Sequence, residues 1–248
     1  MVETNGRNFD LLTLGQVLLR LSPPDNERLS RGDTFVKQVG GAELNVAVGA
    51  ALLGLHTGVI SKLPAHDIGS FMKGKIRSFG VSDDFFMYDQ SPAARVGIYY
   101  YENGAYPRKP KVIYDRNHSS FFSLDIDEIP EEVYTASKCF HTTGITLALN
   151  EDIRETTIEM IKRFKAAGTL VSFDVNFRGN LWTGDQAREC ILRILPYVDI
   201  FFCSEDTARL TFLKTGTARE MMKSFTEEFP ISIVASTQRI VHSPKRHT

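Results

Sequence analysis

The sequence predicts an α/β fold: a mostly parallel sheet flanked by helices, with a small β-sheet acting as a lid. Three observations carry this expectation. Buried-strand and amphipathic-helix patterns alternate along most of the chain, which favours right-handed crossovers between parallel strands. Glycines follow several helical stretches, at places where they end helices. Two extended pairs interrupt the alternation, and we expect such inserted strands to form a sheet of their own.

The alternating elements follow from apolar periodicity and turn residues, taken in chain order. The helix expected at 151–167 has the clearest pattern, because Ile153, Ile158 and Phe164 recur near one face and Gly168 follows. Strands are expected at 9–14, 57–61, 138–142, 169–174, 198–203 and 231–235. The other helices are expected at 42–53, 66–79, 185–195, 205–213 and 218–229. The tail from Val241 to Thr248 is expected to be a loop.

The two inserted pairs are expected to form the lid. The first spans 18–38, around the turn residues from Ser22 to Asn26, and predicts a hairpin. The second joins 94–101 to 111–115. The whole chain, 1–248, is expected to be one domain, with a lid formed by about 16–38 and 94–122. Open α/β sheets bind ligands beyond the carboxyl ends of their strands, so such a lid would cover the site.

Composition gives no argument for binding to nucleic acid or membranes. The chain has 29 basic and 30 acidic residues, a formal net charge of -1, so no charge surplus attracts a polyanion. The start of the chain shows no apolar signal core, and no run is long enough to span a bilayer. Cys139, Cys190 and Cys203 form no Cys-x-x-Cys pair and are typical of reduced thiols. We therefore expect a cytoplasmic protein with small-molecule partners.

The segment Gly40-Gly41-Ala42-Glu43-Leu44-Asn45 carries the most specific signal. A Gly-Gly pair opens a helix of small residues, where bare backbone and unpaired N–H groups admit a ligand closely. The segment resembles the N-terminal signature of the PfkB/ribokinase family of sugar kinases. The resemblance covers the chain from Phe9 to about Val241. It implies a ribokinase-like fold, with Gly40, Gly41 and Asn45 in contact with the substrate.

The segment from Phe173 to Arg178 places polar side chains at the end of a buried strand. Asp174, Asn176 and Arg178 occupy alternate positions and project together from an extended chain. A strand end with a solvated salt bridge is the plainer interpretation, and from the residues alone the two stand about even. The segment resembles the Asp-x-Asn-x-Arg of the 2-keto-3-deoxygluconate kinase branch of the family. That resemblance implies that Arg178 binds the substrate, and that Asn176 and Arg178 contact the nucleotide.

Further candidates lie on the expected lid strands. Tyr99 in Gly97-Ile98-Tyr99, and Tyr114 with Arg116, resemble substrate contacts of the same branch; any one tyrosine, taken alone, fits an ordinary strand aromatic better. Arg20, in Leu18-Leu19-Arg20-Leu21-Ser22-Pro23-Pro24, also resembles that branch. Many other family members carry an aspartate in that region, and an arginine favours an acidic sugar.

The nucleotide side resembles the family less closely. Ser204 stands where the family has the Asn of an Asn-x-x-Glu motif, although a helix N-cap fits Ser204 equally well. Ser236 falls in a segment, 233–238, that resembles the start of the family's ATP site. The P-loop spacing from Gly69 to Lys75 is rejected, because it lies within an expected helix and lacks the following Ser or Thr. The six histidines share no metal-ligand spacing, so the metal ligands stay unknown.

The resemblance implies ATP-dependent, Mg²⁺-dependent transfer of a phosphoryl group to a hydroxyl of 2-keto-3-deoxygluconate or a similar acidic sugar. The family's catalytic aspartate lies in a C-terminal Gly-x-Gly-Asp, which these 248 residues do not contain. We therefore expect a C-terminally incomplete kinase domain with no catalytic base of its own, inactive alone and with an uncovered apolar sheet face. The alternatives are a catalytically dead sugar-acid-binding protein, or a kinase for another sugar such as fructose or for a nucleoside. A homodimer through the lid is expected by resemblance alone.

Overall fold

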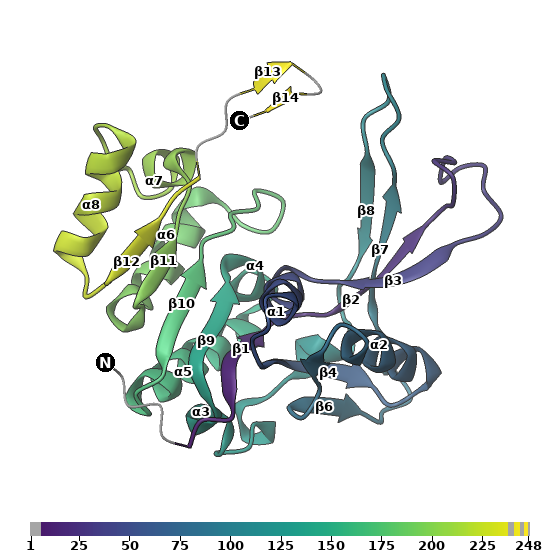
Figure 1. The fold of residues 1–248 in the computed structure, drawn as a ribbon, viewed down its shortest axis with the longest axis horizontal. Helices are drawn as coiled ribbons and strands as arrows, with labels where there is room; N and C mark the ends of the chain where they lie inside the picture. Colours follow the sequence, from purple (N-terminus) through teal and green to yellow (C-terminus); the bar gives the residue numbers. More distant parts are fainter. Residues whose placement is uncertain (1–5, 238–240, 244–245, 248) are drawn as a thin grey trace.

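The computed structural model describes residues 6–237, 241–243 and 246–247, and one large parallel sheet forms its central layer (Figure 1). The strands run in the order β12-β11-β10-β9-β1-β4-β5, and β6 also pairs with β4. Their bounds are β1 Phe9–Leu14, β4 Thr57–Pro64, β5 Val81–Ser82, β6 Phe86–Asp89, β9 Ser137–Thr143, β10 Leu170–Asp174, β11 Ile200–Phe202 and β12 Ile233–Ala235. Every strand pair in this sheet is parallel, as the sequence predicts.

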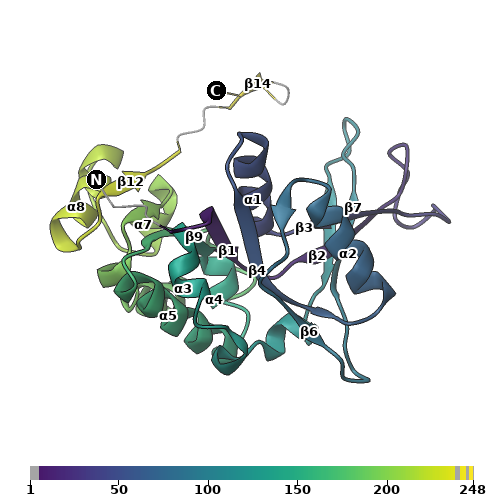
Figure 2. The same ribbon diagram turned by 60° about the horizontal axis from the view of Figure 1, so that its bottom comes forward.

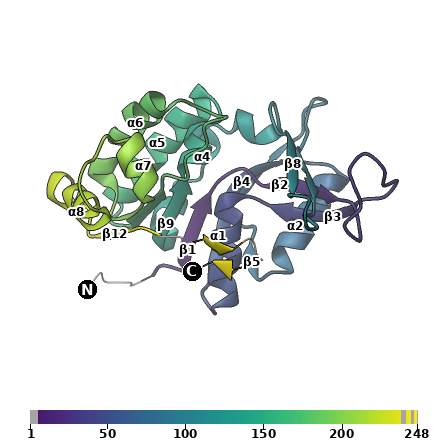
Figure 3. The ribbon, with the colours of Figure 1, turned by 90° about the horizontal axis from the view of Figure 1, so that it is seen from above.

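Helices cover both faces of the large sheet. Val59 and Ile60 are neighbours on β4 and therefore point to opposite faces. Val59 joins a buried cluster with α1 (Ala42–Leu52) and α2 (Asp67–Arg77). Ile60 joins the larger cluster, which contains α5 (Glu151–Ala166). Figure 3 shows α1 on one side of the strands and α5 and α6 on the other.

Side chains cap several of the helices. Asn150 accepts a hydrogen bond from the Ile153 amide (2.9 Å) at the start of α5, while Thr183 and Thr217 each head a capping box. The helices not yet given are α3 Val133–Ala136, α4 Gly144–Leu147, α6 Gly184–Leu192, α7 Glu205–Leu210 and α8 Ala218–Glu228, with 3-10 turns η1 Ser120–Ser123, η2 Ile126–Glu128 and η3 Leu195–Tyr197. Among the described residues, no helix is both long and apolar enough to cross a membrane.

A second, four-stranded sheet projects from the first (Figures 1 and 2). Its order is β3-β2-β7-β8, with β2 Leu18–Ser22, β3 Val36–Gly40, β7 Gly97–Glu102 and β8 Lys111–Asp115. Both expected hairpins are present as antiparallel pairs, and a parallel pairing of β2 with β7 joins them. The chain passes between this small sheet and the main domain at four links, 15–17, 41, 90–96 and 116–119.

The structure corrects the expected elements in three places. The tail prediction was wrong, because Val241–Ser243 (β13) and Arg246–His247 (β14) pair as antiparallel strands; the other tail residues lie outside the described ones. The short strands β5 and β6 were not expected, since two and four residues are too few for a period to emerge. The short helices α3 and α4 were not expected either, for the same reason.

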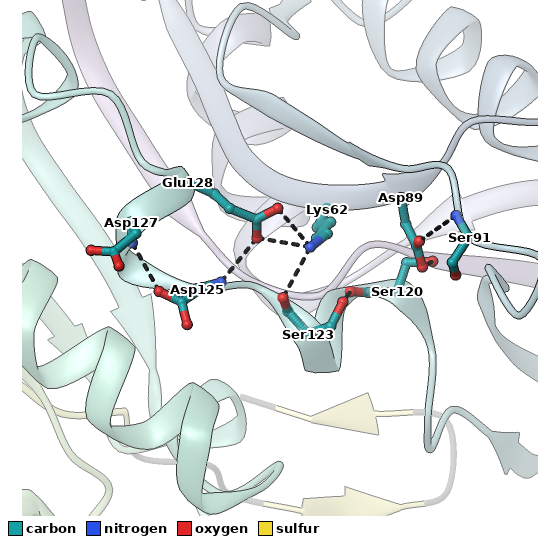
Figure 4. Close-up of polar contacts among 8 residues, drawn as sticks. All are labelled: Lys62, Asp89, Ser91, Ser120, Ser123, Asp125, Asp127 and Glu128. Atoms are coloured by element: carbon teal, nitrogen blue, oxygen red, sulfur yellow. Dashed lines mark hydrogen bonds and ion pairs between the residues drawn. The ribbon is translucent and has the colours of Figure 1, made fainter.

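Buried polar contacts anchor the chain where it returns from the small sheet (Figure 4). The Lys62 ammonium, 9% exposed, donates to both carboxylate oxygens of Glu128 at 2.7 Å and to the Ser123 carbonyl at 2.9 Å. The Ser120 hydroxyl donates to Asp89 Oδ2 (2.8 Å), and the Ser120 amide donates to the Arg95 carbonyl (2.9 Å). The segment after β8 is therefore tied both to β4 and to the end of β6.

We predict that Lys62→Met lowers the free energy of unfolding by about 1–3 kcal/mol, because the Ser123 carbonyl and Glu128 lose their buried donor. Urea denaturation followed by circular dichroism measures the change. The matched control is Lys223→Met, which breaks an ion pair with Glu227 whose side chains are 71% and 58% exposed and should barely move the midpoint. Equal midpoints for both variants would contradict the anchoring role of Lys62.

Candidate functional site

A cavity of about 470 Å³ lies between the small sheet and the carboxyl ends of the large sheet's strands. The small sheet, the start of α1 and the segment after β10 each contribute to its wall. Its lining contains Gln16, Leu18, Arg20, Gly41, Ala42, Glu43, Asn45, Tyr99, Tyr101, Val112, Tyr114, Arg116, Ile145, Asn176 and Arg178. The structure thus brings six of the seven expected substrate-binding residues to one cavity, all except Gly40.

The two glycines of the Gly-Gly pair have different surroundings. Gly40 is buried, and a Cβ at this position would collide with the Tyr99 hydroxyl, so Gly40 makes room for a side chain of the cavity wall. Gly41 has a φ of 155°, which L side chains rarely adopt, and a Cβ there would lie 2.8 Å from the Gln16 carbonyl oxygen. Gly41 therefore brings the start of α1 against the β1–β2 link, and Asn45, exposed one turn later, also lines the cavity.

A row of side chains across the small sheet faces this cavity. The strand register places Arg20 beside Tyr99 and Tyr99 beside Tyr114. The ring centroids of the two tyrosines are 6.0 Å apart, and burial raises the pKa of Tyr99. The Arg20 guanidinium lies 4.3 Å from the centroid of the Tyr101 ring, and its Nε donates to Ser22 Oγ at 2.9 Å. Aromatic faces and an arginine charge thus share one wall.

Arg116 follows β8, and its side chain is held by a hydrogen bond to Gln16. Its Nε donates to Gln16 Oε1 at 2.8 Å, and its guanidinium carbon lies 5.7 Å from the centroid of the Tyr114 ring. Burial lowers the pKa of Arg116, and the nearby Glu43 carboxyl acts in the opposite direction. Arg116 is thus a fixed, half-buried cation on the cavity wall.

The segment after β10 turns sharply between this cavity and a second one. Asn176 has a positive φ of 38°, and its amide donates to Asp174 Oδ1 at 2.9 Å, which fixes the turn. Burial raises the pKa of Asp174, against the effects of that hydrogen bond and of Arg178. Gly144 allows the close approach, since a Cβ there would collide with the Val175 carbonyl. Asn176 and Arg178 consequently line both cavities.

The second cavity, of about 350 Å³, contains all four residues expected on the nucleotide side: Asn176, Arg178, Ser204 and Ser236. Its wall is formed by the segments that follow β10, β11 and β12. Ser204 is also the N-cap of α7, accepting a hydrogen bond from the Thr207 amide at 3.2 Å. Both interpretations of Ser204 therefore fit the same position. Gln238, the last residue of the expected ATP-site segment, lies outside the described residues.

Sequence reasoning assigned no role to two buried residues of the first cavity, Gln16 and Glu43. Glu43 is 1% exposed, and its Oε1 accepts hydrogen bonds from Thr143 Oγ1 (2.6 Å) and Thr146 Oγ1 (2.8 Å). Burial raises the pKa of Glu43, although these hydroxyl donors and Arg116 oppose the rise. The sequence signal for Glu43 was a charged residue among the small and apolar residues that begin the helix. Its partners lie a hundred residues away and carry no motif.

The described residues contain no group of three or more His, Cys, Asp or Glu side chains that could hold a metal ion. Glu205, at the start of α7, forms an ion pair with Arg209 at 3.0 Å. Asp174 is the carboxylate that lines the second cavity.

Comparison with known proteins gives consistent matches. A sequence model of the family described as pfkB family carbohydrate kinase matches residues 8–238. The 2-dehydro-3-deoxygalactonokinase of Haloferax volcanii is 34% identical over 92% of this chain and 71% of its own length. The 2-dehydro-3-deoxygluconokinase of Bacillus subtilis is 31% identical over 72% of this chain, which spans 54% of that protein. The crystal structure of 2-dehydro-3-deoxygluconokinase from Thermotoga maritima superposes with a TM-score of 0.86 at 30% identity, covering 93% of this chain and 72% of that one.

We predict that Gly41→Ala destabilises the fold by about 1–3 kcal/mol, the cost of a strained backbone position, because the new Cβ meets the Gln16 carbonyl. Gly49→Ala on the same helix is the matched control. A Cβ at Gly49 meets nothing within 4 Å, and replacing a helical glycine should be neutral or stabilise by about 0.5–1 kcal/mol. Urea denaturation measures both, and a Gly41 variant as stable as the Gly49 variant would refute the close approach.

Proposed function

The chain belongs to the pfkB family of carbohydrate kinases, a family of phosphotransferases, and we propose that it serves the ATP-dependent phosphorylation of an acidic sugar of the 2-keto-3-deoxygluconate class. One observation supports this proposal most directly. Arg20, Arg116 and Arg178 line one cavity, and Arg178 also lines the neighbouring one. An acidic sugar in the first cavity and a nucleotide in the second would both contact Arg178.

The charge balance of the first cavity favours an anionic ligand. Glu43 is the acidic residue in its lining, against three arginines, and this carboxyl is buried and hydrogen-bonded by the Thr143 and Thr146 hydroxyls. Arginine binds carboxylates through parallel N–H donors, which gives direction as well as affinity. The Tyr99 and Tyr114 rings supply apolar faces and hydroxyls suited to the carbon chain and hydroxyls of a sugar.

The wall shared by the two cavities supports phosphoryl transfer between them. Phosphoryl transfer depends on placing donor and acceptor in line and on stabilising charge on the transferring group. Asn176 and Arg178 stand where the two ligands would meet, and the Arg178 guanidinium supplies positive charge at that point. We assign Ser204 and Ser236 to the nucleotide, with Mg²⁺ brought by its phosphates and neutralising them.

The catalytic base is expected from a Gly-x-Gly-Asp segment, which the 248 residues lack. We therefore propose that these 248 residues bind their ligands but do not turn them over. A kinase acting on a neutral sugar such as fructose is the second candidate, and a sugar-acid-binding protein without catalysis is the third. The three arginines favour an acidic ligand over the second candidate.

We further infer that two copies associate through the small sheet in a cytoplasmic protein. β8 is one of the two outer strands of that sheet, and Val112 and Ile113 on it are 42% and 43% exposed. An outer strand with exposed apolar side chains is a surface that pairs readily with another chain. The three cysteines are free, which suits a reducing compartment.

Ligand titration by calorimetry, run beside an ADP-release assay, tests the function. We expect 2-keto-3-deoxygluconate or 2-keto-3-deoxygalactonate to bind in the presence or absence of MgATP, and fructose to bind far more weakly. We expect no ADP release from the 248-residue chain. Binding of fructose in preference to both sugar acids would refute the acidic substrate. Metal-dependent ADP release coupled to phosphosugar formation would refute the assignment of the base to a Gly-x-Gly-Asp segment.

We predict that Arg116→Ala weakens sugar-acid binding by about 1.5–3 kcal/mol, the scale of a charge-assisted hydrogen bond. Calorimetry measures the loss. Arg188→Ala serves as the control, because Arg188 lies on α6 outside both cavities and pairs with Asp185. Unchanged affinity in the Arg116 variant would remove this residue from the site.

A further inference from the structure

We propose that Gln16 is a positioning residue that aims Arg116 at the substrate's acid group, and that its neutral amide leaves the arginine charge free for that group. This inference rests on the proposed function and adds a residue that the sequence did not single out. Gln16 lies in the link between β1 and β2, and its side chain is 3% exposed.

Each polar atom of the Gln16 side chain is bound to the segment that follows β8. Oε1 accepts from Arg116 Nε at 2.8 Å. Nε2 donates to the Arg116 carbonyl at 3.1 Å and to Ser119 Oγ at 2.6 Å. One amide therefore holds both the side chain and the main chain of Arg116. Gly97 gives this amide its space, since a Cβ there would lie 2.8 Å from Nε2 and 3.4 Å from the Arg116 Cα.

These contacts leave the outer edge of the guanidinium open. Gln16 uses the Nε donor of Arg116, and none of the described residues accepts a hydrogen bond from its Nη1 or Nη2 atoms. Both Nη atoms are the donors that a carboxylate binds in parallel. Holding a long side chain in one orientation before binding removes the entropy cost of ordering it afterwards.

The amide also matters for charge. A carboxylate at this position would accept from Arg116 Nε equally well, but it would pair with the arginine and offset its charge. The Gln16 amide orients Arg116 and adds no charge of its own. The main chain of Gln16 also lies against Gly41 at the start of α1, because the Gln16 carbonyl oxygen is the atom that a Cβ on Gly41 would meet.

Two substitutions test the amide in different ways. Gln16→Met keeps the length of the side chain and removes all three hydrogen bonds. Gln16→Glu keeps the shape and the acceptor for Arg116 Nε, adds a negative charge, and loses the N–H donor to the Arg116 carbonyl. The readout is the ratio of dissociation constants for 2-keto-3-deoxygluconate and 3-deoxyglucosone, its neutral aldehyde counterpart. We expect each variant to bind the acid about tenfold more weakly and the neutral compound within about twofold, the size of one charge-assisted hydrogen bond.

A double-mutant cycle tests the route through Arg116. In an Arg116→Ala background, Gln16→Met should cost no further acid affinity, because the residue that it orients is gone. Gln90→Met is the matched control, since Gln90 is exposed in the loop after β6 and should leave the ratio unchanged. Far-UV circular dichroism checks folding, and if the methionine variant unfolds, Gln16→Glu alone decides.

The outcomes distinguish this inference from the function beneath it. A parent chain that binds neither sugar acid overturns both. If the parent binds the acid and Arg116→Ala weakens binding, but both Gln16 variants keep the parent's ratio, the inference fails and the function stands. Loss of acid affinity in Gln16→Met but not in Gln16→Glu overturns the argument from charge. An equal loss for the acid and the neutral compound overturns the route through Arg116 and leaves Gln16 a structural residue.

Discussion

A buried carboxylate holds together the segments from which the first cavity is built. Glu43 on α1 accepts hydrogen bonds from Thr143 and Thr146, which lie at the end of β9 and in α4. Gly15, just after β1, leaves the space that the Glu43 carboxylate occupies, since a Cβ on Gly15 would collide with it. Burying a carboxyl is costly unless it is hydrogen-bonded, so these contacts fix α1 against two strand ends. Gly41, Asn45 and the Gln16 link depend on that placement, and the cavity wall depends on them.

The alternation of strands and helices and the parallel pairing of the large sheet were predictable from sequence, and the elements that were not expected have physical reasons. Long periodic segments such as 151–167 gave the right element, since one buried face of a helix repeats often enough to be recognised. The two residues of β5 and the four of α4 contain about one repeat each, too little for a period to be recognised. The Gly-Gly pair and the segment ending at Arg178 were visible because neighbouring residues carry them. Gln16 was not visible in this way, since its amide binds Arg116 and Ser119, which lie a hundred residues later in the chain.

Parallel strands explain why polar residues so far apart in sequence meet. The chain leaves each of β1, β9, β10, β11 and β12 at the same edge, so every following segment reaches the same side of the molecule. The two cavities lie along this edge, and the turn at Asn176 separates them. Because Asp174 and the positive φ of Asn176 fix that turn, the partition between the cavities is part of the backbone rather than a mobile side chain.

The four links between the two sheets carry a further consequence. Three of them contain residues of the first cavity: Gln16 in the first, Gly41 in the second and Arg116 in the fourth. Any rotation of the small sheet against the large one must be absorbed by backbone torsions in these links. Such a rotation would therefore also move the ligand-binding groups, because they belong to the linking segments. The shape of the cavity and the orientation of the small sheet therefore change together. A molecule that binds Arg116 and Gly41 at once also fixes the angle between the two sheets.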